Sequence, residues 1–454
     1  MRPFWFLPVV GLCLLSLTVN AQDSAKWNLQ RCIEYAARNN LTVMQSELTR
    51  QISKNNYTQS YLNLLPSINA GITNDFTNGK QFNLAAFKLT TQTSMTFATS
   101  LSGDLTLFAG LQQVHNIMRN KYSYQAAEFD LKDARNTAAL NITTGFLQIM
   151  LAKENMKVAD NQRQMTMSQK EMIAKRVSAG VLPETNLLDI DAQLARDESN
   201  MAVAKNSYDL AVLALRLLLQ LKPEDAFEVD LPQLQDQNIT LLAEGFALTV
   251  YKGAVNTQPS ILAEMARVKS AEYNTKMAKG ALSPTINVSG NLYDYYNNQQ
   301  KRLITGTTDY ETIPLKDQYS DQFRKSVTFT LAIPIFGKWQ RMNAIQNSMV
   351  QAQGAKLQLE ARKNALMQTI YQADADARAA ASLYAASQKS YEASKRAFDA
   401  QSKRYGTGAT TTLDYQTAKN NLAAVESELI RNKYTYVFRL KVLDFYQGKP
   451  ITLE

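Results

Sequence analysis

The sequence predicts an α+β fold in which one unit of long helices and two β-strands occurs twice in tandem. The segment at 62–72 recurs at 280–290, at an offset of 218, and the segment at 174–195 recurs at 402–423, at an offset of 228. With 17 glycines and 11 prolines in 454 residues, the chain has few residues that interrupt regular structure. We therefore expect long elements rather than many small domains.

The first 21 residues have the pattern of a secretory signal peptide. Arg2 is followed by an apolar stretch over 4–19, and the small-residue sequence at 19–21 suits a cleavage site. We expect the mature chain to begin at Gln22. A lipid anchor would require a cysteine directly after the cleavage site, whereas Cys13 lies inside the apolar stretch. Lipid anchoring is therefore the less favoured alternative.

Each repeat is predicted to contain helices and strands in the same order. The first repeat, 22–222, has a helical pattern over 23–65, strands at about 67–77 and 90–108, a long helix over 111–178 and a return helix over 183–222. An inter-repeat linker at 223–246 leads to the second repeat, 247–440, and then to a C-terminal tail at 441–454. The second repeat has strands at about 285–293 and 324–336, a long helix over 338–405 and a return helix over 411–440.

The predicted strands alternate apolar and polar residues. In the second repeat, the apolar residues fall at every other position of each strand: Ile286, Val288 and Leu292, then Val327, Phe329, Leu331, Ile333 and Ile335. Serine, threonine and asparagine stand between them, which is typical of a strand with one face toward lipid and the other toward water. A half-buried strand of a soluble sheet is the alternative, but the sequence predicts no further strands for such a sheet to join.

The strands also bear on how the chain would cross a membrane. No segment after the predicted signal peptide has the roughly 18 apolar residues that a transmembrane helix requires, so a crossing would have to use a β-barrel. Two pairs of strands are too few for one chain, because even a barrel filled by its own side chains needs about eight strands. Closure thus requires several copies, and we expect a cyclic homo-oligomer.

The composition argues against an enzyme and against a nucleic-acid-binding protein. After the predicted signal peptide, Cys32 is the only cysteine and His115 the only histidine, so no intramolecular disulfide is possible and packing roles are expected for both. We find no catalytic, cofactor-binding or metal-binding motif. The formal charge of +9 falls to +8 when Arg2 is removed with the signal peptide. The basic residues of the chain alternate with acidic ones, which is typical of a solvated helix surface and not of a nucleic-acid-binding surface.

The signal peptide, the duplicated order of elements and the paired turns between long helices together resemble the TolC-like outer membrane factor family of outer membrane efflux proteins. The resemblance covers essentially the whole mature chain. It implies a homotrimer whose pooled strands form a 12-stranded transmembrane β-barrel in outer-membrane lipid, on a long periplasmic α-barrel. It also implies a passive exit channel of a tripartite efflux or type I secretion system, engaged by a periplasmic adaptor (membrane fusion protein) and an inner-membrane transporter.

Two turns between long helices carry the residues that the resemblance marks as functional. The first turn contains Arg176, Val177 and Gly180, and the second contains Arg404, Tyr405 and Gly408. In the family, such turns are where the adaptor docks and where the closed entrance is held. The same residues also suit a helix end, because glycine favours the position after the last helical turn and arginine complements the helix dipole there. Both readings can hold, because a turn must form before a partner can dock on it.

The resemblance further implies an entrance gate of one arginine and two aspartates just after the second turn, and that gate is incomplete here. Alignment from Tyr405 places the first carboxylate on Asp414, whereas the other two positions hold Thr410 and Thr417. Three copies of Asp414 would form an anionic ring that favours cations, although an aspartate near a helix start often only complements the dipole. Asp414 is the remaining gate candidate, with Asp189 as a second one.

The segment at 293–322 carries five tyrosines among asparagine and glutamine. In a barrel this is the larger extracellular loop, with some tyrosines at the level of the lipid headgroups, although a soluble tyrosine-rich loop would have the same composition.

Two other functions are consistent with parts of the sequence. A soluble periplasmic coiled-coil scaffold or pump adaptor would explain the long helices and the secretion signal, but not the four amphipathic strands placed symmetrically in the repeat. Within the channel class, efflux and type I secretion use the same kind of duct. We expect efflux, which is the more frequent role in the family.

Overall fold

A computed structural model describes residues 26–83, 86–222, 224–232, 243 and 245–449. The predicted signal peptide, residues 223, 233–242 and 244 of the predicted linker, and the end of the predicted tail lie outside these residues. The chain forms two compact units. Of the described residues, the first unit contains 26–36 and 142–232, and the second contains 37–141 and 243–449.

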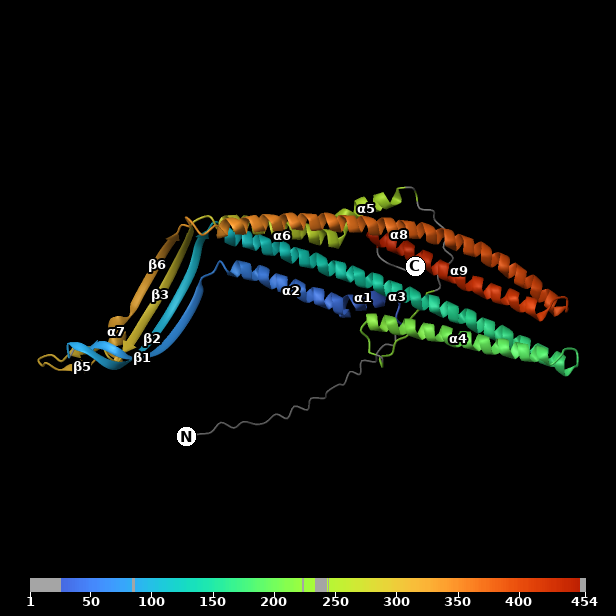
Figure 1. Cartoon of the computed structure of the whole chain (residues 1–454), viewed down its shortest axis with the longest axis horizontal. Coiled ribbons are helices and arrows are strands. Elements are labelled where there is room, and N and C mark those ends of the chain that lie inside the picture. The colour runs from blue at the N-terminus through green and yellow to red at the C-terminus, as the bar shows by residue number, and fades with distance from the viewer. Residues whose placement is uncertain (1–25, 84–85, 223, 233–242, 244, 450–454) are drawn as a thin grey trace, which may run out of the picture. The chain divides into compact units, whose positions relative to one another are not determined.

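The elements follow one another in the order of a tandem repeat (Figure 1). The first repeat contains α1 (Leu29–Asn39), α2 (Leu41–Leu62), β1 (Ser67–Asn83), β2 (Lys88–Ala109), α3 (Gln112–Ser178) and α4 (Thr185–Leu218). The second contains α5 (Phe246–Thr257), α6 (Pro259–Gly280), β3 (Thr285–Asn297), β4 (Lys301–Leu303), β5 (Tyr310–Thr312), α7 (Leu315–Gln322), β6 (Arg324–Ala332), α8 (Gln340–Gly406) and α9 (Thr412–Tyr446). The predicted α+β class is confirmed.

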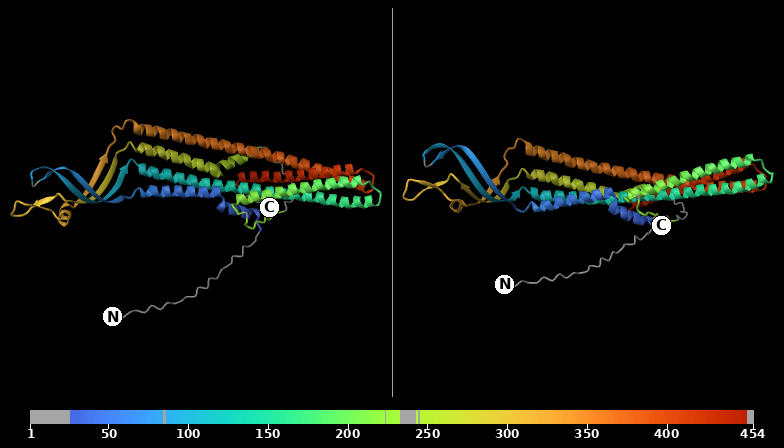
Figure 2. Two further views of the ribbon diagram at one scale, coloured as in Figure 1. Left: turned by 60° about the horizontal axis from the view of Figure 1, so that its bottom comes forward. Right: turned by 90° about the horizontal axis from the view of Figure 1, so that it is seen from below.

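The two longest helices, α3 and α8, have 67 residues each, as the absence of proline from these stretches predicted. Each is about 100 Å long at about 1.5 Å per residue. Helices α8 and α9 lie side by side (Figure 2). Between them Tyr384 stacks on Tyr436 with ring centroids 5.8 Å apart, and both rings are buried. Burial of these aromatic rings stabilises the pair of helices.

The single helix predicted over 23–65 is wrong, because the chain interrupts it at Asn40. Asn40 is extended (φ −66°, ψ 130°), and its side chain accepts a hydrogen bond from the backbone N–H of Thr42, which caps the start of α2. The second repeat is interrupted at the equivalent position, at the offset of 218, where Gln258 is extended (φ −68°, ψ 124°) and Pro259 begins α6. The interruption therefore belongs to the repeat.

Strands β1, β2, β3 and β6 form an antiparallel sheet in this order, and they lie side by side in Figure 1. The central pair, β2 and β3, joins the two repeats, with Leu101 opposite Leu292 and Gly103 opposite Gly290. Since side chains alternate across a sheet, these positions share the apolar face with Ile68 of β1, whereas Ser102 and Asn291 lie on the other face. Strands β1 and β6 form the two edges.

Each second strand turns into its long helix through two consecutive residues with positive φ. In the first repeat these are Gly110 (φ 58°) and Leu111 (φ 59°), and in the second, at the offset of 228, Lys338 (φ 49°) and Trp339 (φ 63°). Glycine is required at position 110 because a Cβ there would lie 2.2 Å from the carbonyl oxygen of Gly280. The backbones of the two repeats are thus in contact at the junction between the sheet and the helices.

The predicted C-terminal tail at 441–454 is wrong over its first six residues, because α9 continues to Tyr446. Leu443 is buried in a cluster with Ala373 and Ala377 of α8, and Tyr446 packs on a second cluster around Ile370. This burial favours continuing the helix beyond residue 440.

The predicted extracellular loop at 293–322 is also more ordered than expected. Strand β3 continues to Asn297 because it pairs with β2 as far as Thr96, and β4, β5 and α7 follow. Gln318 of α7 is buried; its Oε1 accepts from the Asn297 backbone N–H at 2.9 Å, and its Nε2 donates to the Asn297 carbonyl at 3.0 Å. At the other end, β6 stops at Ala332, before the predicted 336, because Ala332 lies opposite the first residue of β3.

Among the described helices, none has both the length and the apolar composition that crossing a membrane requires.

Candidate functional site

The turn between α3 and α4 is closed by a pair of backbone hydrogen bonds typical of a helix end. The N–H of Val181 donates to the carbonyl of Arg176 at 2.9 Å, and the N–H of Gly180 donates to the carbonyl of Val177 at 2.9 Å. Gly180 has φ +74°, the left-handed conformation that this type of turn demands. The first group of predicted docking residues is therefore assembled in one turn, which lies in the first unit.

The turn between α8 and α9, in the second unit, is built in the same way. The N–H of Ala409 donates to the carbonyl of Arg404 at 2.8 Å, and the N–H of Gly408 donates to the carbonyl of Tyr405 at 3.1 Å. Gly408 has φ +76°, and each of these residues stands 228 positions after its counterpart in the first turn. Residues far apart in the chain thus build the same turn twice, as the recurrence of the sequence predicted.

The two turns differ in the side chains that cover them. Tyr405 stacks on Tyr415 with ring centroids 4.7 Å apart, and its hydroxyl lies 3.4 Å from Oγ1 of Thr412. Burial raises the pKa of Tyr415, whose counterpart in the first turn is Leu187. The second turn therefore carries an aromatic pair where the first turn has aliphatic Val177, so a partner would meet different surfaces at the two turns.

The predicted gate residue Asp414 lies in the first turn of α9, where it takes part in a helix cap. Its carboxylate accepts from the hydroxyl of Thr411 at 2.7 Å and from that of Thr410 at 3.3 Å, while its backbone N–H donates to Oγ1 of Thr411 at 3.1 Å. The Thr411 hydroxyl bonded to the carboxylate lowers the pKa of Asp414. Thr411 thus caps the start of α9 with its hydroxyl, and a role of Asp414 at the entrance stays a prediction.

The second gate candidate, Asp189, is exposed on α4 near its start. The residue 228 positions after it is Thr417, whereas the residue 228 positions before Asp414 is Asn186. The two aspartates are therefore not repeat equivalents, and the structure places them in different units. The gate role of Asp189 also stays a prediction.

A buried polar cluster between α3 and α4 was missed by the sequence analysis. Asp197 of α4 accepts hydrogen bonds from Thr166 of α3 and, at 2.8 Å, from Gln193, and it is 5% exposed. Lys170 pairs with Asp191 at 2.8 Å on the same two helices. The spacing of four residues between Gln193 and Asp197 places them on one helix face, but only the packed helices show that this face is buried.

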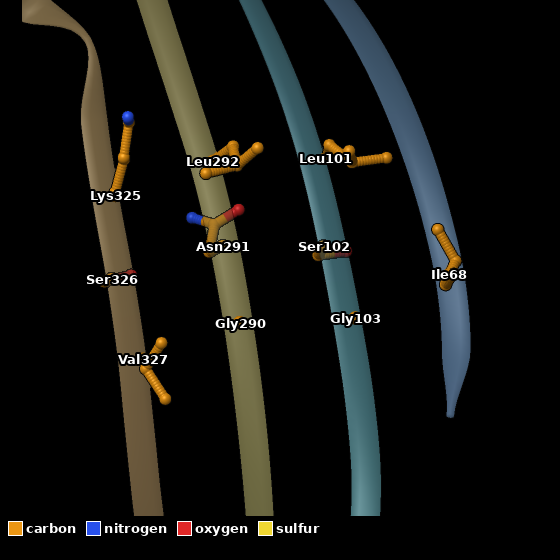
Figure 3. Close-up of a pocket in the computed structure, with 10 residues that line it drawn as sticks. All are labelled: Ile68, Leu101, Ser102, Gly103, Gly290, Asn291, Leu292, Lys325, Ser326 and Val327. Carbon is orange, nitrogen blue, oxygen red and sulfur yellow. The ribbon is translucent and has the colours of Figure 1, made fainter. Parts of the chain in front are cut away.

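The apolar face of the sheet has a shallow hollow of about 370 Å³ across all four strands (Figure 3). At its centre Gly103 lies opposite Gly290, and Ile68 and Val327 continue the same row onto β1 and β6. Two glycines side by side leave the middle of the row without side chains. Lys325 lies at the margin of the hollow, so a single basic group stands beside an otherwise apolar surface.

The opposite face of the sheet is polar where it meets the helices. A second hollow, of about 640 Å³, is lined there by residues that include Asp104, Thr106, Asn287, Ser289 and Thr330. Asp104 lies opposite both Ser67 and Ser289. This face offers hydroxyl, amide and carboxylate groups to water.

Within the described residues, no group of three or more histidine, cysteine, aspartate and glutamate side chains is placed to hold a metal ion. Cys32 is buried in α1, and this burial raises the pKa of its thiol to about 12.

The comparisons with known proteins agree with the duplicated architecture. The sequence model of the family described as outer membrane efflux protein matches residues 32–220 and 250–448, one stretch in each repeat. TolC of Escherichia coli, an outer membrane protein, is 22% identical over 445 residues, which cover 95% of this chain and 84% of TolC. The outer membrane efflux protein BepC of Brucella suis is 28% identical over 187 residues, which cover 41% of this chain and 38% of BepC.

Solved structures share the fold. The open state of the Neisseria gonorrhoeae MtrE outer membrane channel superposes with a TM-score of 0.73 at 19% identity, covering 94% of this chain and 90% of MtrE.

Proposed function

The chain belongs to the outer membrane efflux protein family, and from this membership we propose that it is the outer-membrane exit channel of a tripartite efflux system. The protein resides in the outer membrane, and its helical part lies in the periplasm. Members of this family are conduits for transport. The observation that carries the proposal is the match of the family to both repeats, together with a sheet that has one apolar and one polar face.

In the proposed channel, three copies of the chain surround one pore. Three copies of the four-stranded sheet would supply twelve strands, which is enough for a barrel, whereas one copy is not. The apolar face, with Ile68, Val288 and Phe329, would meet lipid, and the polar face, with Asp104 and Asn287, would line a water-filled pore. The long helices would continue this pore through the periplasm.

The channel we propose is passive. An inner-membrane transporter supplies the energy, and a periplasmic adaptor joins that transporter to the channel. We assign adaptor docking to the two turns with Gly180 and Gly408, because they present equivalent backbones twice per chain and therefore six times per trimer. We assign Asp414, in three copies, to the entrance, where its lowered pKa keeps the carboxylate charged; Asp189 is the second candidate for this role.

We propose efflux rather than protein secretion as the role of this duct. The family description and the name of BepC both specify efflux. The hydroxyl and amide groups on the polar face of the sheet suit the passage of small hydrated solutes.

The test is the oligomeric mass and conductance of the full chain. Protein purified from outer membranes in detergent should have the mass of a trimer by light scattering, and it should give steady single-channel conductance in a planar bilayer. A host that lacks this gene should accumulate a fluorescent efflux substrate, and the restored gene should reverse that accumulation. A soluble monomer without conductance would overturn the proposal in favour of a periplasmic scaffold.

A further inference from the structure

The hollow on the apolar face of the sheet is made by two glycines that the backbone does not require. Gly103 and Gly290 lie opposite each other on β2 and β3, and neither has a positive φ. A Cβ on Gly290 would meet nothing within 4 Å, and one on Gly103 would lie 3.5 Å from the carbonyl oxygen of Ser67, an ordinary contact. Glycine weakens a strand and often marks a place where a ligand approaches it closely. Space is thus left where side chains would fit.

The hollow is not a product of the repeat. The residues equivalent to Gly103 and Gly290, at the offsets of 228 and 218, are Leu331 and Ile72, and both of these are large and exposed. The pattern of the strands therefore accommodates large apolar side chains at these positions. Apolar side chains border the hollow (Figure 3): Ile68, Leu101, Leu292 and Val327.

Lys325 is the basic residue that borders the hollow, and it stands on the apolar face. It lies opposite Leu292, and residues directly opposite each other in an antiparallel pair share a face. It is two residues from Val327, toward the end of the sheet that is farther from the helices. The equivalent residue of the first repeat is Phe97. A cation therefore occupies a position of the apolar face where the duplicated strand has an apolar ring.

The charge of Lys325 has no carboxylate partner among the residues that the structure describes. Its Nζ lies 5.0 Å from the centroid of the Phe323 ring, and the side chain points away from the hollow (Figure 3). Asp294, two positions beyond Leu292 on the same face, is buried, and its Oδ1 accepts from the backbone N–H of Tyr295 at 2.8 Å. A charged side chain on a lipid-facing surface normally pairs with an opposite charge or reaches for the interface.

The depth of Lys325 in the proposed barrel suits contact with lipid headgroups. Leu292, opposite Lys325, is four residues beyond Val288 on β3, which is about 10 Å of height at about 3.3 Å per residue and a strand tilt of about 40°. With Val288 near the middle of an apolar band about 25 Å tall, Lys325 lies close to the outer margin of that band. Its long side chain then carries the ammonium group to the level of the headgroups.

We propose that the hollow and Lys325 form a binding site for an anionic lipid of the outer leaflet, with an acyl chain in the hollow and the phosphate on the Lys325 ammonium group. The site rests on the proposed channel, whose apolar face meets lipid, and a trimer carries it three times. A phosphate forms charge-assisted hydrogen bonds with the ammonium group and compensates its charge. A zwitterionic lipid brings its own cation, so it fills the hollow without compensating Lys325.

Native mass spectrometry of the full-length protein with added lipid tests the phosphate contact. The probes are dimyristoyl phosphatidate, which carries a phosphate monoester, and dimyristoyl phosphatidylcholine, which has the same acyl chains and no net charge. The wild-type trimer should bind phosphatidate several-fold more tightly, and Lys325→Met should lower phosphatidate binding to the level of phosphatidylcholine. The matched control is Arg324→Met, which removes the adjacent exposed cation on the opposite face and should keep the preference.

A second variant tests the acyl chain. Gly290→Val places a side chain in the hollow, and valine favours a strand, so the sheet should form while the binding of both lipids weakens several-fold. Gly79→Val is the matched control. It lies in β1, away from the hollow, and a Cβ there also meets nothing within 4 Å, so lipid binding should not change.

Light scattering and conductance of the same samples separate the lipid site from the proposed channel. A conducting trimer whose preference for phosphatidate survives Lys325→Met, or whose lipid binding is unaffected by Gly290→Val, would overturn the site and leave the channel in place. Association of trimers that only Gly290→Val abolishes would assign the hollow to a second trimer and would also overturn the site. A protein that forms no trimer and does not conduct would overturn both.

Discussion

At the scale of single residues, the clearest requirement is the left-handed glycine that closes each helical turn. Gly180 and Gly408 have φ of +74° and +76°, and a Cβ at either position would meet nothing within 4 Å. A side chain there is therefore opposed by backbone conformation and not by crowding. The left-handed conformation costs about 1–2 kcal/mol for an ordinary L-residue, and less for asparagine, which tolerates it.

We predict that Gly180→Val combined with Gly408→Val impairs export while trimers remain intact. The strained turns would no longer present the backbone on which the adaptor is proposed to dock. Accumulation of a fluorescent efflux substrate in cells measures export, and light scattering measures assembly. The matched control is the pair Gly180→Asn and Gly408→Asn, which should keep most of the export. Undiminished export by the valine variant would remove the docking role of these turns.

Cys32 is predicted to be nearly inert toward alkylation in the folded protein. Burial raises the pKa of its thiol from 9.0 to about 12, and only the thiolate reacts. The neutral thiol favoured by the fold contributes stability below pH 9, and this contribution is lost as the pH rises toward 12. Iodoacetamide labelling followed by mass spectrometry should show a rate that still rises above pH 9. Ser178→Cys, at an exposed turn, is the reactive control; equal labelling of both thiols at pH 8 would contradict the prediction.

At the scale of elements, the backbone contact between Gly110 and Gly280 determines how closely the two repeats pack where the sheet meets the helices. A Cβ on Gly280, at the end of α6, would lie 2.3 Å from the carbonyl oxygen of Gly110. The neighbour that it would meet is backbone, which cannot rotate away as a flexible side chain would. The close approach of β2 to the end of α6 thus depends on glycine at both positions.

We predict that Gly280→Ala destabilises the protein by about 1–3 kcal/mol, the usual cost of overpacking. The thermal unfolding midpoint of the detergent-solubilised protein measures the change. Gly253→Ala is the matched control, since a Cβ on this residue of α5 meets nothing within 4 Å. Alanine there should leave the midpoint unchanged or raise it, because alanine favours the helix by about 0.5–1 kcal/mol over glycine. Equal midpoints for both variants would show that the backbones separate easily.

At the scale of the whole molecule, the two faces of the sheet decide how the protein meets its surroundings. Val288 of β3 lies on the apolar face, between Leu105 and Phe329, while the neighbouring Asn287 lies on the polar face, between Thr106 and Thr330. One residue along the strand therefore separates a position proposed to touch lipid from one proposed to line the pore.

We predict that Val288→Lys prevents stable insertion into the outer membrane. A lysine that faces lipid near the middle of the bilayer costs about 2–4 kcal/mol, and the trimer would carry three of them. Asn287→Lys is the matched control and should insert normally while its conductance shifts toward anions. The amount of trimer in outer-membrane fractions and the ion selectivity in planar bilayers are the measurements. Normal insertion of Val288→Lys would mean that this face does not meet lipid.

Several features of the molecule follow from local sequence alone. The long helices α3 and α8 follow from stretches without proline, the strands from apolar residues at every other position, and the turns at Gly180 and Gly408 from recurring glycines at helix ends. Each of these depends on neighbours within a few residues, so local chemistry determines it. The recurrence itself, read at two offsets, established the tandem repeat and with it the family resemblance.

Other features depend on contacts between residues far apart in the chain, and only the tertiary structure decided them. Asp197 is buried because α3 packs on α4. The order of strands that leaves β1 and β6 at the edges is set by the pairing of β2 with β3. Backbone hydrogen bonds between distant strands have no signature in the local pattern of either strand, which is why the edges of the sheet had to come from the fold.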